Sequence, residues 1–97
     1  MKIFISQPMS GLTDEQIQQD RQRIISAVGS IFSGQEIEVL DSFFKNFTGD
    51  PLEYLGKALA IMAEADCVVF AEGWKESRGC SIEHLCAVQY GKNFVEL

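Results

Sequence analysis

The sequence predicts a three-layer α/β fold of the Rossmann or flavodoxin type, built on a small parallel sheet of four, or at most five, strands. Short apolar runs typical of buried strands alternate with stretches that carry the apolar spacing of amphipathic helices. No hairpin signal lies between neighbouring strands, so helical crossovers are expected to join them in parallel. With 97 residues, 46% of them hydrophobic, the chain matches a single domain spanning residues 1–97.

The first strand and the first helix have clear local signals. Residues 2–5 are mostly β-branched or aromatic, which favours a strand covered on both faces. Thr13 and Gln16 match the capping box that opens a helix. Arg21 falls on the apolar side of this helix, which is expected to end near residues 33–34.

A shorter strand and a second helix are predicted next. Residues 36–40 alternate acidic and apolar side chains, which predicts a strand at the edge of the sheet. Residues 41–50 follow no period and are interpreted as a loop. Asp50 and Pro51 open the second helix, because Asp can accept from first-turn amides and Pro has no donor to lose. The buried stripe of this helix is predicted at Leu52, Leu55, Leu59 and Met62.

The functional site is expected within residues 66–92. Residues 67–70 are uniformly apolar, as in a central parallel strand. A polar loop leads from them to a helix that is predicted to begin at Ser81 and to carry Glu83 in its first turn. Residues 94–97 offer the last strand.

Two loops are expected to border one ligand cleft, because ligands of open parallel sheets sit beyond the carboxyl ends of the strands. These loops are residues 6–11, after the first strand, and residues 72–79, after the third. The candidate binding residues are Ser6, Gln7, Pro8, Met9, Gly11, Trp74, Ser77, Arg78, Gly79 and Ser81. Gln7, Met9, Trp74, Ser77 and Glu83 are expected to share the cleft.

Glu83 is the candidate catalytic residue. A carboxylate beside a glycine-containing loop can act as a nucleophile or a general base. A glutamate in a first helical turn can equally be a solvated residue that favours the helix dipole.

His84 follows Glu83 directly, so on a helix the two side chains point roughly 100° apart and do not suit a dyad. Cys80, near the predicted helix start, could have a lowered thiol pKa.

The neighbouring loop residues have two interpretations each. Ser77, Arg78 and Gly79 could bind a phosphate through a hydroxyl, a guanidinium and backbone amides, and a ribose hydroxyl would suit them equally. Arg78 could also be an ordinary surface residue. Trp74 in a polar loop is typical of a stacking wall or an interface anchor, with core packing as the alternative.

Composition narrows the classes of partner. A net charge of −6 without any Lys/Arg cluster does not favour binding to DNA or RNA polymers. No segment has the roughly 18 apolar residues of a membrane span, and no secretion signal is recognisable. Three cysteines without a metal-binding spacing suit a reducing cytoplasm, and no metal or cofactor is expected. A chain this short has a modest core, so a homo-oligomer, a dimer or larger, is expected.

Two segments carry a family resemblance. Residues 65–92 read AD-CVVF-x-x-GW-x-x-SRG-x-x-x-EH-x-x-A-x-x-x-GK, and the chain opens with the run KIFISQPMSG after Met1. They resemble the catalytic helix region and the substrate loop of the nucleoside 2-deoxyribosyltransferase superfamily. The resemblance is closest to the short phage- and bacteria-associated members without an assigned function.

The resemblance implies roles for individual residues. Glu83 would attack the anomeric carbon of a deoxynucleoside and form a deoxyribosyl ester. Ser77 and Gly79 would hold the sugar or a 5′-phosphate. The enzymes of this superfamily carry an acidic residue near the base on the helix before the third strand, and this chain has Ala58 at that position.

Three functions are therefore open. The first is N-glycosidic bond cleavage or deoxyribosyl transfer on a deoxynucleoside or its 5′-monophosphate. The second is a module that binds a nucleotide without turning it over. The third is an oligomeric interaction protein with a vestigial site.

Overall fold

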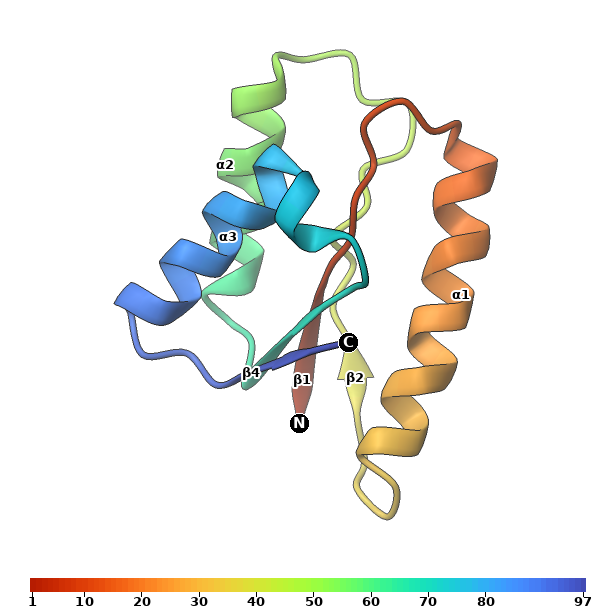
Figure 1. Cartoon of the computed structure of the whole chain (residues 1–97), viewed down its shortest axis with the longest axis vertical. Coiled ribbons are helices and arrows are strands. Elements are labelled where there is room, and N and C mark those ends of the chain that lie inside the picture. Colours follow the sequence, from red (N-terminus) through yellow and green to blue (C-terminus); the bar gives the residue numbers. More distant parts are fainter.

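The computed structural model describes residues 1–97, in which four strands alternate with three α-helices and one short 3-10 helix precedes the last helix (Figure 1). In chain order the elements are β1 (Lys2–Ser6), α1 (Asp14–Ile31), β2 (Glu38–Val39), α2 (Pro51–Met62), β3 (Cys67–Phe70), η1 (Trp74–Glu76), α3 (Arg78–Gln89) and β4 (Phe94–Glu96). No helix is long and apolar enough to cross a membrane.

The four strands form one parallel sheet in the order β2-β1-β3-β4. This confirms the predicted α/β class, with four strands in the order that opens flavodoxin-type folds. The chain moves outward in one direction from β1 to β2 and in the other direction from β3 to β4. The strand order therefore reverses between β1 and β3, where parallel sheets of this type bind ligands.

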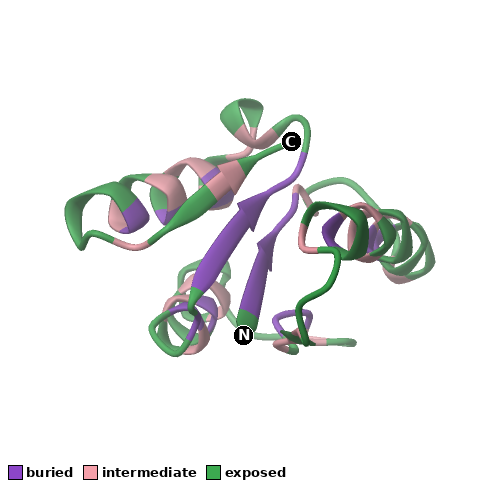
Figure 2. Ribbon diagram, turned by 90° about the horizontal axis from the view of Figure 1, so that it is seen from below, coloured by how far each residue is buried: buried purple, intermediate pink, exposed green.

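Helices cover both faces of the sheet, as Figure 2 shows for the buried central strands between them. On one face, Phe4, Val68 and Phe70 pack against α2 and α3. On the other face, β1 and β3 pack against α1, where the core residues are Ile3, Ile5, Val28, Cys67 and Val69. Alternate residues of each central strand thus serve opposite layers, as the period of two in a strand requires.

The predicted starts of the first two helices are confirmed. The Thr13 hydroxyl accepts from the Gln16 amide N–H at 3.1 Å, and the Gln16 side chain accepts in return from the Thr13 N–H at 3.0 Å. Asp50 accepts from the Leu52 N–H at 2.8 Å, with Pro51 in the first helical position. Both caps are encoded within four residues, so local sequence is enough to place them.

The prediction that the third helix begins at Ser81 is wrong, because α3 begins at Arg78. Ser77 is its N-cap and accepts from the Cys80 N–H at 3.3 Å. The Ser81 hydroxyl instead donates to backbone carbonyls of the preceding turn, at 3.2–3.3 Å. Glu83 consequently lies in the second turn of α3, away from the unpaired N–H groups of the helix start.

Two other elements are shorter than predicted, and α2 buries a different set of residues. The first helix ends at Ile31, and the edge strand is only Glu38–Val39. Leu52 is 73% exposed, and the buried residues of α2 are Ala58 and Met62. The face of α2 that meets the sheet is therefore shifted relative to the predicted leucine stripe.

Candidate functional site

A cleft of about 1120 Å³ lies beyond the carboxyl ends of β1 and β3. It is bordered by the loop after β1, by the 41–50 loop, and by the N-terminal ends of α2 and α3, which lie at the same end of the molecule in Figure 1. This is the position expected from the reversal of strand order, and loops from both sides of the switch point contribute to it.

Glu83 faces this cleft from the second turn of α3 and is only 7% exposed. Its Oε1 accepts a hydrogen bond of 2.6 Å from the hydroxyl of Ser6, the last residue of β1. Its Oε2 has no hydrogen-bond partner. Because every fully buried side-chain oxygen in the protein has a partner, Oε2 is not fully buried. Oε2 is therefore open to the cleft and to whatever occupies it.

The electrostatic state of Glu83 follows from its burial. Loss of solvation raises the pKa of Glu83 to about 7, and the hydrogen bond from Ser6 acts in the opposite direction. Both protonation states of the carboxyl are thus populated near neutral pH. A carboxyl with a perturbed pKa in a cleft is characteristic of functional sites.

Cys80 lies one turn before Glu83 and is buried at the edge of the same cleft. Burial raises the pKa of the Cys80 thiol, with the hydroxyls of Ser6 and Ser77 acting against it. The expectation of a lowered thiol pKa is therefore wrong, because the helix start does not outweigh desolvation here. Cys80 remains a protonated thiol and is a poor nucleophile.

A buried guanidinium lies behind the cleft lining and binds two of the lining residues, Gln7 and Ser42. Arg21 is 6% exposed, and its Nη1 donates to Gln7 Oε1 at 3.2 Å and to Ser42 Oγ at 3.3 Å. Its Nη2 donates to the Leu40 carbonyl at 2.7 Å, and no carboxylate lies within ion-pair distance. Burial lowers the pKa of Arg21, while Asp41 and Tyr54 act to raise it. Since Arg has only donors, the Gln7 amide oxygen must face it.

Part of the cleft lining is aromatic. Phe44, Phe47 and Tyr54 form a cluster in which the Tyr54 ring meets the other two edge-on, at 4.8 and 5.1 Å between centroids. The Tyr54 hydroxyl accepts from the Phe44 N–H at 3.1 Å and donates to Met9 Sδ at 3.2 Å. The 41–50 loop, the loop after β1 and α2 are thereby held together over the cleft.

Most of the predicted site residues lie in this cleft. The lining includes Ser6, Gln7, Met9, Ser77, Arg78, Gly79 and Glu83. Pro8, Gly11 and Ser81 do not line it. The Ser81 hydroxyl is used inside the protein, and Pro8 lies beside the Gly73 backbone.

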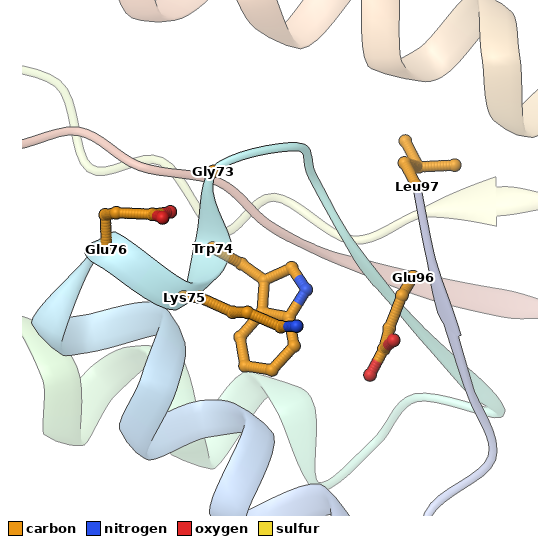
Figure 3. Close-up of a pocket in the computed structure, with 6 residues that line it drawn as sticks. All are labelled: Gly73, Trp74, Lys75, Glu76, Glu96 and Leu97. Atoms are coloured by element: carbon orange, nitrogen blue, oxygen red, sulfur yellow. The ribbon is translucent and has the colours of Figure 1, made fainter.

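Trp74 does not share the cleft with Glu83. Its ring stacks on His84, 3.9 Å between centroids and 13° between planes. Trp74 borders a separate hollow of about 290 Å³ beside Glu96 (Figure 3). His84 also pairs with Glu96, 2.7 Å from Nε2 to Oε2. Lys75 lies over the indole, its Nζ 5.7 Å from the ring. Trp74 is half-buried and packs against the core residue Phe70, 5.6 Å between ring centroids, which agrees with the core-packing alternative.

Sequence reasoning did not single out Arg21, Ser42, Phe44, Phe47 or Tyr54 as site residues. A weak signal existed in the adjacent phenylalanines of the 41–50 loop, since a run of aromatics in a loop has no helix or strand to bury it. Arg21 on an apolar helical face was a second signal, because a charge there requires buried acceptors. No group of three His, Cys, Asp or Glu side chains that could hold a metal is present.

These features define a small α/β protein with a ligand cleft at the switch point of a parallel sheet and a buried carboxyl in that cleft. The chain belongs to the family described as domain of unknown function DUF4406, whose model matches residues 1–96. No curated protein and no solved structure matches the chain.

Proposed function

We propose that this protein cleaves or transfers the N-glycosidic bond of a deoxynucleoside or of its 5′-monophosphate, with Glu83 as the nucleophile. The observation that carries the proposal is the Glu83 carboxyl, held by Ser6 through one oxygen and open to the cleft through the other. The cleft also has room for a nucleotide, because its volume of about 1120 Å³ slightly exceeds the roughly 300–1,000 Å³ that is common for small-molecule sites.

The chemistry follows from a carboxylate facing an electron-poor carbon. Oε2 attacks C1′ as the bond to the base breaks, and the carboxylate stabilises the positive charge that develops on the sugar. A deoxyribosyl ester of Glu83 results. Water then releases the sugar, or a second base takes it. The ionised form of Glu83 is required, so activity rises with pH through about 7.

Two parts of the lining support this choice of substrate. The rings of Phe44, Phe47 and Tyr54 offer apolar surface to a planar base. Arg78 and the amides at the start of α3, where Ser77 is the cap, also border the cleft and suit a phosphate group.

The test is incubation of the protein with deoxynucleosides and their monophosphates, with and without an acceptor base. Chromatography should show release of free base by the wild type and none by Glu83→Gln. Mass spectrometry of acid-quenched protein should show a deoxyribosyl adduct on the peptide that contains Glu83. If Glu83→Gln releases base as fast as the wild type, the proposal is wrong.

A nucleotide-binding module without turnover is the second candidate. Its support is Ala58, which lines the cleft where the family resemblance places an acid, so that no carboxyl of α2 stands there. Calorimetry should then show nucleotide binding while chromatography shows no product.

We also propose that the protein self-associates in a reducing cytoplasm. Leu85 and Val88 are 57% and 49% exposed on one side of α3, and Leu52 is exposed on α2, so apolar surface remains uncovered. All three cysteines are free thiols, as a reducing compartment would keep them. Sedimentation equilibrium measures the oligomer size directly. A protein that is monomeric at all concentrations would contradict self-association, but it would not distinguish an enzyme from a binding module.

A further inference from the structure

The departing base is the part of the proposed reaction that Glu83 cannot assist. When the C1′–N bond breaks, its electron pair stays on the base, and an anionic base leaves slowly unless a group supplies a proton to a ring nitrogen. That group must share the cleft with Glu83. It must also carry a hydrogen that is not committed to a strong acceptor.

The charged side chains around the cleft do not meet both conditions. The Asp14 and Asp50 carboxylates accept backbone N–H groups and so act as acceptors. Glu76 also lines the cleft, but it is exposed, borders the separate hollow beside Trp74 as well, and is held by no hydrogen bond. The Arg78 guanidinium holds its protons too firmly to give one up. Lys57 and Glu64 are exposed and do not line the cleft.

Tyr54 meets both conditions. It lies on α2 one turn before Ala58, lines the cleft and is half-buried. Its hydroxyl hydrogen goes to Met9 Sδ at 3.2 Å, and a thioether is a weak acceptor that a ring nitrogen would readily replace. Its oxygen accepts the Phe44 N–H, so the phenol is held in place by a bond that does not use its proton.

We propose that Tyr54 is a second catalytic residue, which donates its phenolic proton to a ring nitrogen of the departing base. The inference rests on the proposed function and supplies the group that α2 lacks at Ala58. Burial raises the pKa of Tyr54, so the phenol is protonated at rest. The Phe44 N–H and the Arg21 charge act in the opposite direction, and both would stabilise the phenolate once the proton has left.

The step balances without any added reagent. A Glu83 oxygen bonds to C1′, the C1′–N bond breaks towards the base, and the proton of Tyr54 moves to the base, which leaves neutral. In hydrolysis, the oxygen of a water molecule then bonds to C1′ and the ester bond to Glu83 breaks. One proton of that water returns to the Tyr54 phenolate, so both side chains are regenerated.

Comparison of two leaving groups separates proton donation from a merely structural role. A deoxynucleoside needs a proton on its base, whereas 4-nitrophenyl 2-deoxyribofuranoside releases 4-nitrophenolate without one. We expect Tyr54→Phe to lower kcat for the deoxynucleoside by about 10²–10⁴-fold and to leave cleavage of the aryl substrate unchanged. Equal losses on both substrates, or no loss on the deoxynucleoside, would overturn the inference.

A second variant keeps the test decisive if Tyr54→Phe folds poorly or the aryl substrate does not react. The chain has two tyrosines, and Tyr90 is 84% exposed on the far end of α3. In a Tyr90→Phe background, fluorotyrosine labels Tyr54 alone and makes its phenol more acidic with little change of volume. Tyr90→Phe itself should match the wild type, and kcat for the deoxynucleoside should change with the acidity of the label. A kcat that does not respond overturns the inference.

The wild type is measured first, which distinguishes the two levels of the proposal. If the wild type releases no base from any deoxynucleoside, the proposed function fails and takes the role of Tyr54 with it. If the wild type is active and both Tyr54 variants behave as the wild type does, only the role of Tyr54 fails.

Discussion

The hydroxyl of Ser6 donates to Oε1 of Glu83 across 2.6 Å, joining the last residue of β1 to the second turn of α3. The two residues are 77 positions apart in the chain, and the contact lies at the reversal point of the strand order. It orients the carboxyl and leaves one oxygen free. The bond also favours the ionised form of Glu83 against the burial that opposes it.

Ser6→Ala should therefore raise the pKa of Glu83 above about 7. The serine hydroxyl stabilises the carboxylate, so its loss leaves desolvation unopposed, and a higher pH is needed to ionise the group. The acid limb of kcat/KM against pH should move to higher pH in the variant. Ser33→Ala, at an exposed position outside the cleft, should leave that limb in place. A limb that moves to lower pH in Ser6→Ala would contradict this account.

Glu83 should also make the fold less stable as pH rises. Its folded pKa of about 7 lies above its ordinary value of 4.5, so between these values the folded state binds more protons than the unfolded state. The free energy of unfolding then decreases with pH, and the loss is complete above the folded pKa. Glu83→Gln removes this penalty and should be more stable than the wild type by roughly 2–3 kcal/mol at about pH 8.

Urea denaturation at about pH 5 and about pH 8 measures this difference. At the lower pH the Glu83 carboxyl is protonated in the folded state, so Glu83→Gln and the wild type should be nearly equal. The matched control is Glu72→Gln, an exposed position whose effect should not depend on pH. If Glu83→Gln is less stable than the wild type at both pH values, the cost of burying the Glu83 charge does not determine the difference in stability.

The fold was predictable because its signals are local. The buried strands and the caps at Thr13 and Asp50 are each encoded within a few neighbouring residues. The start of α3 was not predictable in this way, because Ser77 and Ser81 are both serines and either could cap a helix. Only the surrounding structure decides between them, because the Ser81 hydroxyl finds carbonyls of the turn before it.

The site was predictable in part, for a related reason. Ser6, Ser77 and Glu83 sit where the ends of adjacent parallel strands must converge, so topology alone places them together. The bond from Arg21 to Gln7 depends on how α1 lies against the sheet and how the 41–50 loop returns across it. The position of Trp74 depends on a turn at Gly73, whose φ of 88° directs the indole towards His84. No spacing in the sequence encodes these approaches.

Arg21→Lys should destabilise the protein by about 2–4 kcal/mol, although the charge is kept. A lysine ammonium is a point donor and cannot reach Gln7, Ser42 and the Leu40 carbonyl in the geometry of the guanidinium fork. At least one buried acceptor would then be left unpaired. Chemical denaturation measures the loss.

The control lies on the same helix. Arg23 is exposed and pairs with Asp20 one turn away, so Arg23→Lys should change the free energy of unfolding by less than about 1 kcal/mol. If the two substitutions cost the same, the hydrogen bonds of Arg21 do not stabilise the protein.

Leu85→Lys should weaken self-association without affecting the fold. Leu85 is exposed on α3, so a charge there is well solvated in a monomer but would be buried in an apolar interface between copies. Sedimentation equilibrium should show a shift towards the monomer, while circular dichroism and the melting temperature of the dilute protein stay close to the wild type. Gln89→Lys, at a neighbouring exposed and polar position, provides the control for added charge.

Arg78→Gln should reveal whether the substrate carries a 5′-phosphate. Arg78 is an exposed residue at the first position of α3, it lines the cleft, and no carboxylate pairs with its guanidinium. A phosphate held there would lose a charge-assisted hydrogen bond in the variant, so KM for a deoxynucleoside monophosphate should rise roughly tenfold. KM for the corresponding deoxynucleoside should not change, because no phosphate is present to contact the side chain.

Lys75→Gln removes a nearby positive charge that faces the separate hollow beside Trp74, and it should affect neither substrate. An equal rise in KM for both substrates would assign Arg78 to the sugar or the base, and no rise for either would make it an ordinary surface residue.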